Sequence, residues 1–168
     1  MLSSVQMSEQ SVFLITGASK GLGRSICEIL ANKGYIVVGL ARQSSELAEL
    51  DTFLKKYNEK SCAIACDLSV PEMVNNTAGE IVERFPAIHG IIHNAGIIGP
   101  VGNIFTVDEA KWNETLVVNL VSVQQLTRAL YPAMVNAGRC RVTTISSGAA
   151  VNSLESWSAY CTSKAGLD

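Results

Sequence analysis

The chain of 168 residues is 48% hydrophobic and 17% charged, with a formal net charge of −2. This composition suits one globular domain, and it excludes both a disordered chain and a basic nucleic-acid-binding protein. No apolar run approaches the roughly 20 residues of a membrane span, and the first ten residues carry no export signal. We therefore expect a cytoplasmic protein with neither membrane nor nucleic-acid partners.

Buried strands and helices alternate along the chain after a flexible tail expected at residues 1–11. Strands are predicted at 12–16, 35–41, 62–66, 88–93 and 141–146. Helices are predicted at 22–32, 45–57, 71–85, in one or two pieces over 108–137, and from about 156 to the end. Because apolar, β-branched runs alternate with helices, we predict an α/β fold with a doubly wound parallel sheet of the Rossmann type, forming one domain over 12–168.

The cysteines and histidines do not predict a metal site. The five cysteines are odd in number and contain no CxxC pair, which indicates reduced thiols. His89 and His93 lie on an apolar run without ligand-like spacing, so we interpret them as structural.

Three glycines, Gly17, Gly21 and Gly23, follow the first predicted strand within seven residues. Glycines at such a turn let backbone N–H groups approach a pyrophosphate at the start of the next helix. The spacing differs from the common GxGxxG pattern. An ordinary strand-to-helix turn is the alternative.

Tyr160 and Lys164 lie four residues apart, which places both side chains on one face of a helix. A neighbouring ammonium stabilises a phenolate, so Tyr160 is a candidate proton donor or acceptor near neutral pH. An exposed helix carrying an unrelated tyrosine and lysine is the alternative for this pair alone.

Together, the glycine spacing and the Tyr160/Lys164 pair resemble the short-chain dehydrogenase/reductase family. The segment Asn94-Ala95-Gly96 is similar to the family's NNAG motif, with His93 in place of the first asparagine. Asn119, Asp67 and Ser147 also fall at family positions, and Ser147 precedes Tyr160 by thirteen residues. The resemblance covers nearly the whole chain.

The resemblance implies a role for each matching residue. Tyr160 would protonate a carbonyl oxygen, Lys164 would assist it and bind the nicotinamide ribose, and Ser147 would orient the substrate. Asn119 would help hold a water between Lys164 and solvent. Taken alone, Ser147 could be a strand-end cap and Asn119 a helix-start residue. The implied cofactor-binding residues are Gly17, Ser19, Lys20, Gly21, Leu22, Gly23, Arg42, Asp67, Leu68, Asn94, Ala95, Gly96, Tyr160 and Lys164.

The charges near the second strand bear on the choice of cofactor. An NAD-binding chain places an acid at the end of this strand, but here Ala41 is followed by Arg42, and Lys20 lies in the glycine turn. Two cations near the adenosine ribose suit a 2′-phosphate, so we expect NADP(H). The alternative is two solvated surface charges.

The expected activity is NADPH-dependent reduction of a carbonyl, meaning a ketone, aldehyde or dicarbonyl. Trp157 and the run from Ser146 to Ala150 resemble the branch of sepiapterin and benzil reductases, and Ile97, Ile98 and Val151 are further candidate pocket walls. Family members extend well beyond residue 168, so we expect a C-terminally truncated domain with strand order 3-2-1-4-5 and the last strands missing. The alternatives are a non-catalytic NADP-binding fragment, an inactive truncated relative, or a piece that only associates with full-length partners. The complete protein is expected to be a homo-oligomer, a dimer or tetramer.

Overall fold

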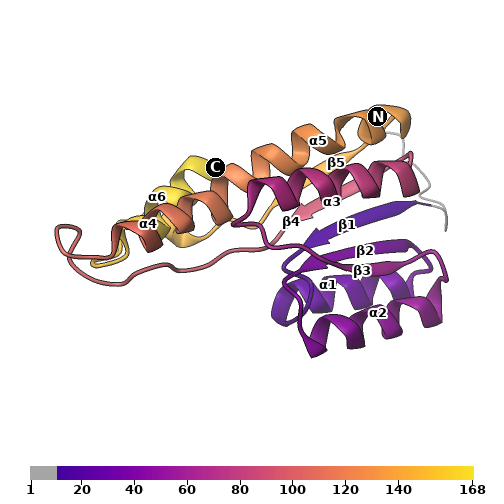
Figure 1. Ribbon diagram of the computed structural model, residues 1–168, viewed down its shortest axis with the longest axis horizontal. Coiled ribbons are helices and arrows are strands. Elements are labelled where there is room, and N and C mark those ends of the chain that lie inside the picture. Colours follow the sequence, from indigo (N-terminus) through magenta and orange to yellow (C-terminus); the bar gives the residue numbers. More distant parts are fainter. Residues whose placement is uncertain (1–10) are drawn as a thin grey trace, which may run out of the picture.

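A computed structural model describes residues 11–168 and places a five-stranded parallel sheet between two layers of helices (Figure 1). The strand order is β3-β2-β1-β4-β5, which confirms the predicted topology. The strands are β1 (Val12–Thr16), β2 (Ile36–Ala41), β3 (Cys62–Ala65), β4 (Gly90–His93) and β5 (Arg141–Thr144). Because all five strands run parallel, their carboxyl ends meet at one edge of the sheet.

Two pairs of helices cover the faces of the sheet (Figure 1). The helices α1 (Gly21–Asn32) and α2 (Ser45–Tyr57) lie on one face, and α3 (Pro71–Arg84) and α5 (Ser122–Asn136) lie on the other. Beyond the carboxyl edge, α4 (Glu109–Leu116) packs against α6 (Ser158–Leu167). A short 3₁₀ turn, η2 (Gly148–Ala150), also packs against α6.

The central strand β1 supplies both cores because successive side chains of a strand point to opposite faces. Leu14 joins the cluster that contains Val74 of α3 and Leu126 of α5, whereas Ile15 joins the cluster that contains Leu50 of α2. All of these side chains are almost fully buried. This two-sided burial explains why the strands read as continuous apolar runs.

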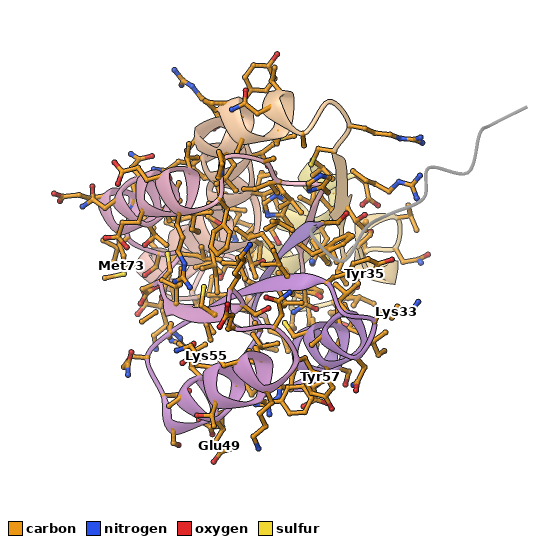
Figure 2. The ribbon with its side chains drawn as sticks, turned by 90° about the vertical axis from the view of Figure 1, so that its right-hand side faces the viewer. Lys33, Tyr35, Glu49, Lys55, Tyr57 and Met73 are labelled. Carbon is orange, nitrogen blue, oxygen red and sulfur yellow. The ribbon has the colours of Figure 1, made fainter. Side chains whose placement is uncertain are left out.

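The helices bury one side only, as their mixed composition requires. In α2, Leu50 and Leu54 are fully buried, whereas Lys55 is exposed and Glu49 points away from the sheet (Figure 2). Ser44 caps this helix by accepting a hydrogen bond from the backbone N–H of Leu47 (3.2 Å).

Most strand and helix boundaries agree with the prediction to within two residues, and the differences include the following three. Ser11, expected as the last tail residue, is buried, and its carbonyl accepts a hydrogen bond from Ile36 (3.1 Å); the rest of the expected tail lies outside the described residues. The predicted helix over 108–137 is divided by a π-helical segment, η1 (Val117–Val121). The fifth strand ends at Thr144, two residues earlier than expected.

In the part of the chain that the structure describes, no helix is long and apolar enough to cross a membrane.

Candidate active site

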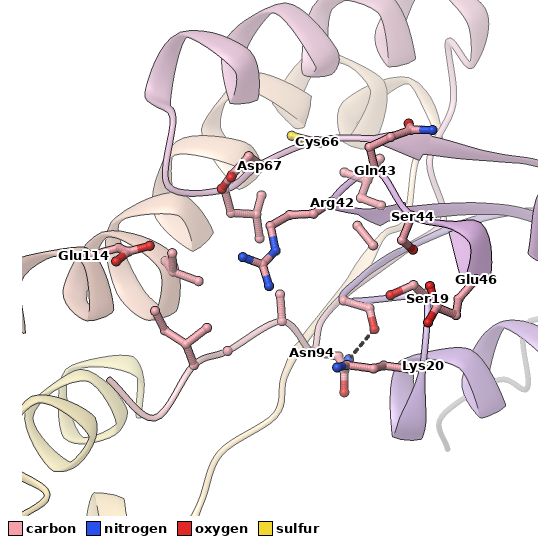
Figure 3. Close-up of a pocket in the computed structure, with 18 residues that line it drawn as sticks. Ser19, Lys20, Arg42, Gln43, Ser44, Glu46, Cys66, Asp67, Asn94 and Glu114 are labelled. Carbon is pink, nitrogen blue, oxygen red and sulfur yellow. Dashed lines mark hydrogen bonds between the residues drawn. The ribbon is translucent and has the colours of Figure 1, made fainter. Parts of the chain in front are cut away.

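A cavity of about 670 Å³ opens at the carboxyl edge of the sheet, beside the ends of β1 to β4 (Figure 3). Its size lies within the range of small-molecule and cofactor sites. Many of the predicted cofactor-binding residues line it: Gly17, Ser19, Lys20, Arg42, Asp67, Leu68, Asn94, Ala95 and Gly96. Five others do not: Gly21, Leu22, Gly23, Tyr160 and Lys164.

The glycine turn uses each glycine for a different reason. Gly17 (φ +66°) and Gly21 (φ +56°) adopt the left-handed backbone conformation that favours glycine. Gly23 is required for packing, since a Cβ there would lie 2.2 Å from the carbonyl oxygen of Gly17. Leu22 is 56% exposed and does not line the cavity, so its expected contact with the cofactor stays a prediction.

The start of α1 is suited to a phosphate group. Lys20 is the N-cap residue, but no side chain of the described residues caps this end, and the first turn contains no acidic residue. The first N–H groups of a helix lack intrahelical partners and attract anions. By contrast, Ser44 and Glu46 already occupy the start of α2. The chemistry of this turn therefore fits the pyrophosphate of a dinucleotide.

Asn94 supports the glycine turn from β4. Its side-chain amide donates to the carbonyls of Thr16 (3.0 Å) and Gly17 (3.2 Å). In return, the Thr16 hydroxyl oxygen accepts from the backbone N–H groups of Asn94 and Ala95 (both 3.1 Å). Asn94 thus shapes the cavity by joining its two sides, and its amide donors are used within the protein.

Arg42 and Asp67 occupy the part of the cavity beyond β2 and β3 (Figure 3). The Asp67 carboxylate accepts hydrogen bonds from the backbone N–H (2.9 Å) and the hydroxyl (2.7 Å) of Ser69. These bonds, together with the charge of Arg42, hold the pKa of Asp67 below its usual value. The cavity therefore carries an ionised acid beside one of its cations.

Lys164 is held on α6 with its ammonium pointing to the end of β5. Its Nζ donates to the carbonyl of Ile145 (2.6 Å) and lies 5.8 Å from the centre of the Tyr160 ring. Only 4% of Lys164 is exposed, and burial lowers its pKa, while the Asp168 carboxylate acts in the opposite direction. The predicted pair is therefore formed, and the Tyr160 hydroxyl has no hydrogen-bond partner among the described residues.

Asn119 lies in the π-helical segment and joins the segment after β4 to α6. Its Oδ1 accepts from the backbone N–H of Ile97, and its Nδ2 donates to the carbonyl of Ile97 (both 2.8 Å) and to the hydroxyl of Ser163 (2.9 Å). The side chain thus connects the segment after β4 to α6. Both hydrogens of the Asn119 side-chain amide are bonded to protein atoms. The expected role of Asn119 in holding a water stays a prediction.

Ser147 begins η2 and caps it, since its hydroxyl oxygen accepts from the backbone N–H of Ala149 (3.2 Å). Ser147 therefore caps the 3₁₀ turn that follows β5 and not the end of the strand itself, which lies at Thr144. The hydroxyl hydrogen is still available to a substrate oxygen, because the capping bond uses only a lone pair.

Gly96 connects the cavity to the Tyr160/Lys164 pair. It lines the cavity, and a Cβ at this position would lie 3.4 Å from Asn119 Oδ1 and 3.9 Å from Lys164 Nζ. The absence of a side chain at Gly96 therefore leaves the two parts of the site side by side.

Sequence reasoning missed several lining residues. Glu46 and Glu114 both reach the cavity, as do Gln43, Ser44, Cys66 and Val118. The run of Ser44, Ser45 and Glu46, which begins two residues after Arg42, was the available signal for the first of these acids. Glu114 carried no such signal, because α4 borders the cavity only in the folded chain.

The family model for short chain dehydrogenases matches residues 11–168. The chain belongs to this family. A short chain dehydrogenase of Monascus ruber is 32% identical over an alignment of 167 residues that covers 96% of this chain and 55% of the relative. An uncharacterized oxidoreductase of Saccharomyces cerevisiae is 29% identical over 94% of this chain and 61% of its own length. The 3-oxoacyl-acyl-carrier-protein reductase of Escherichia coli is 28% identical over 95% of this chain and 64% of its own length.

Solved structures of this short chain dehydrogenase family agree in fold. A metagenomic short-chain oxidoreductase in complex with NADP has a TM-score of 0.86 and 32% identity, covering 95% of this chain and 73% of that one. A short-chain dehydrogenase from Streptomyces avermitilis has a TM-score of 0.84 and 31% identity, covering 99% of this chain and 58% of that one. The chain spans about 55–64% of the length of the curated relatives named here.

Proposed function

We propose that this oxidoreductase uses NADPH to reduce a carbonyl group, with Tyr160 as the proton donor. The observation that carries the proposal is the position of Gly96, which lines the cofactor-sized cavity and lies beside Lys164. A dinucleotide with its pyrophosphate at the start of α1 would extend toward this glycine. The bound cofactor would supply the hydride that adds to the carbonyl carbon.

The chain's own residues would supply the proton and the electrostatic support. Tyr160 would transfer its hydroxyl proton to the carbonyl oxygen, and the Lys164 ammonium would stabilise the resulting phenolate. Ser147 would donate a hydrogen bond to the same oxygen as negative charge develops on it. The Asn119 side chain, by joining Ile97 to Ser163, would keep these groups in register.

The NADP preference rests on the two cations that line the cavity, Lys20 and Arg42. Solved relatives in complex with NADP or NADPH support it. Arg42→Asp should weaken NADPH binding by about tenfold or more and shift preference toward NADH, because a charge-assisted hydrogen bond contributes about 1.5–3 kcal/mol. Equal affinity of the unchanged protein for both cofactors would contradict this part of the proposal.

The substrate is proposed to be a ketone, aldehyde or dicarbonyl that enters beside Trp157. The Trp157 ring meets the Tyr160 ring edge-on, with 5.8 Å between centres. Ile98 and Val151, expected as pocket walls, are 46% and 82% exposed. We also propose that the complete protein is a dimer or tetramer, which light scattering would test.

The decisive experiment compares Tyr160→Phe with Tyr131→Phe, a control on the exposed side of α5. Loss of the Tyr160 hydroxyl should lower turnover of a diketone by about 100-fold or more, while NADPH binding stays within twofold. Tyr131→Phe should leave both unchanged. Lys164→Met should reduce turnover and binding together. If wild type binds NADPH but turns over no carbonyl, the alternative of a non-catalytic nucleotide-binding protein is favoured instead.

A further inference from the structure

Glu46 brings a carboxylate into the cavity at the place where its cations lie. It belongs to the first turn of α2 and lines the same cavity as Ser19, Lys20 and Arg42. Figure 3 shows its side chain reaching from the start of α2 toward Ser19 of the glycine turn. The end of β2, where an NAD-binding chain places an acid, carries Ala41 instead.

The local contacts of Glu46 keep it ionised. Hydrogen bonding to its own backbone N–H and to the hydroxyls of Ser44 and Ser45, together with the charge of Lys20, holds its pKa below the usual value. The Ser45 hydroxyl donates to Glu46 Oε2 (3.4 Å). The positive charge of Lys20 is therefore partly offset before any nucleotide arrives, just as Asp67 offsets Arg42.

A carboxylate at this place affects the two nicotinamide cofactors in opposite directions. The 2′-hydroxyl of NADH can donate a hydrogen bond to it, whereas the 2′-phosphate of NADPH carries like charge. We propose that Glu46 limits the cofactor preference of this site, by favouring NADH and opposing the preference for NADPH that Lys20 and Arg42 create. This inference rests on the proposed dinucleotide function.

The test compares Glu46→Gln with Glu49→Gln. Glu49 lies one turn further along the same helix, is exposed and points away from the sheet, so its loss changes net charge equally without touching the cavity (Figure 2). Dissociation constants for NADPH and NADH would be measured by cofactor fluorescence. We expect Glu46→Gln to tighten NADPH binding by about three- to tenfold and to weaken NADH binding by about twofold. Glu49→Gln should change neither by more than about 1.5-fold.

Salt dependence separates charge repulsion from a structural effect. The gain in NADPH affinity of Glu46→Gln should shrink as ionic strength rises from about 0.02 to 0.5 M, because the Debye length shortens. A gain that is independent of salt would contradict the electrostatic role.

The outcomes also separate this inference from the function it rests on. Measurable binding of both cofactors with an unchanged NADPH/NADH ratio in Glu46→Gln would overturn the role of Glu46 alone. Failure of wild type to bind either cofactor would overturn the proposed function and this inference with it. If Glu46→Gln proves unstable, Glu46→Ser provides the same test, because serine also removes the charge and suits the first turn of a helix.

Discussion

The strands β1 and β5 belong to the same sheet, two positions apart, yet they are held in different ways. Leu14 and Ile15 of β1 are fully buried and anchor the two apolar cores. In β5, Arg141, Val142 and Thr143 are exposed, and no described residue from position 141 onward belongs to either core. Burial of apolar surface stabilises the first region, because the hydrophobic effect grows with the area removed from water.

Directional polar contacts hold the second region. Lys164 donates to the carbonyl of Ile145, the Ser146 hydroxyl donates to Asp168, and Asn119 donates to Ser163. Such bonds fix orientation but contribute only about 1 kcal/mol each. The difference teaches that the nucleotide-binding end of the site rests on a packed core, whereas the Tyr160/Lys164 pair is positioned mainly by hydrogen bonds.

The most direct test of this difference in packing is to remove apolar groups from both strands. Leu14→Ala should lower the free energy of unfolding by about 2–5 kcal/mol, because it leaves a cavity between the sheet and its helices. Val142→Ala should cost less than about 1 kcal/mol, because Val142 is already 40% exposed. Urea denaturation would measure both. A loss at Val142 as large as that at Leu14 would show that β5 is packed as firmly as β1.

A second prediction concerns the pH dependence of stability at β4, the strand that lies between β1 and β5. His93, at the end of β4, is 3% exposed, and its Nε2 pairs with the Thr127 hydroxyl of α5 (2.8 Å). Burial lowers the pKa of His93 from 6.5 to about 4, so the folded protein binds fewer protons there than the unfolded chain. The stability that depends on neutral His93 is fully present above pH 6.5 and is lost as pH falls toward 4. A shift of this size corresponds to about 3 kcal/mol.

The variant His93→Asn isolates that contribution, since asparagine does not titrate. Melting temperatures would be compared at pH 7, 6, 5 and 4. Wild type should lose more stability than His93→Asn between pH 6.5 and 4, whereas the carboxyl groups affect both proteins alike. Parallel pH profiles for the two proteins would contradict the assignment.

The third prediction tests how tightly the packed region holds the glycine turn. Gly23→Ala places a Cβ against the Gly17 carbonyl oxygen, so it should cost about 1–3 kcal/mol of stability and weaken NADPH binding. Gly79→Ala is the control, because a Cβ there meets nothing within 4 Å on the exposed side of α3. It should stabilise the protein by about 0.5–1 kcal/mol. Thermal melting and cofactor titration of both variants would check this.

The order of elements and the two main motifs were open to prediction because they depend on local spacing. Apolar runs separated by amphipathic segments predicted the parallel sheet, and the resemblance to the family predicted its strand order. Helical spacing predicted that Tyr160 and Lys164 share a face, and the glycines after β1 predicted the turn that lines the cavity. The strands, the helices and the shared face of Tyr160 and Lys164 need only the periodicities of helix and strand, which neighbouring residues determine.

Other features depend on residues far apart in the chain, so only the tertiary structure decided them. Asn119 bonds to Ile97 and Ser163, which are 22 and 44 residues away. Glu46 reads as an ordinary first-turn acid until the fold places α2 beside the glycine turn, and Gly96 gains its importance only when α6 brings Lys164 next to it. Periodicity shows which side chains are buried, whereas the packing of whole helices determines which polar groups meet.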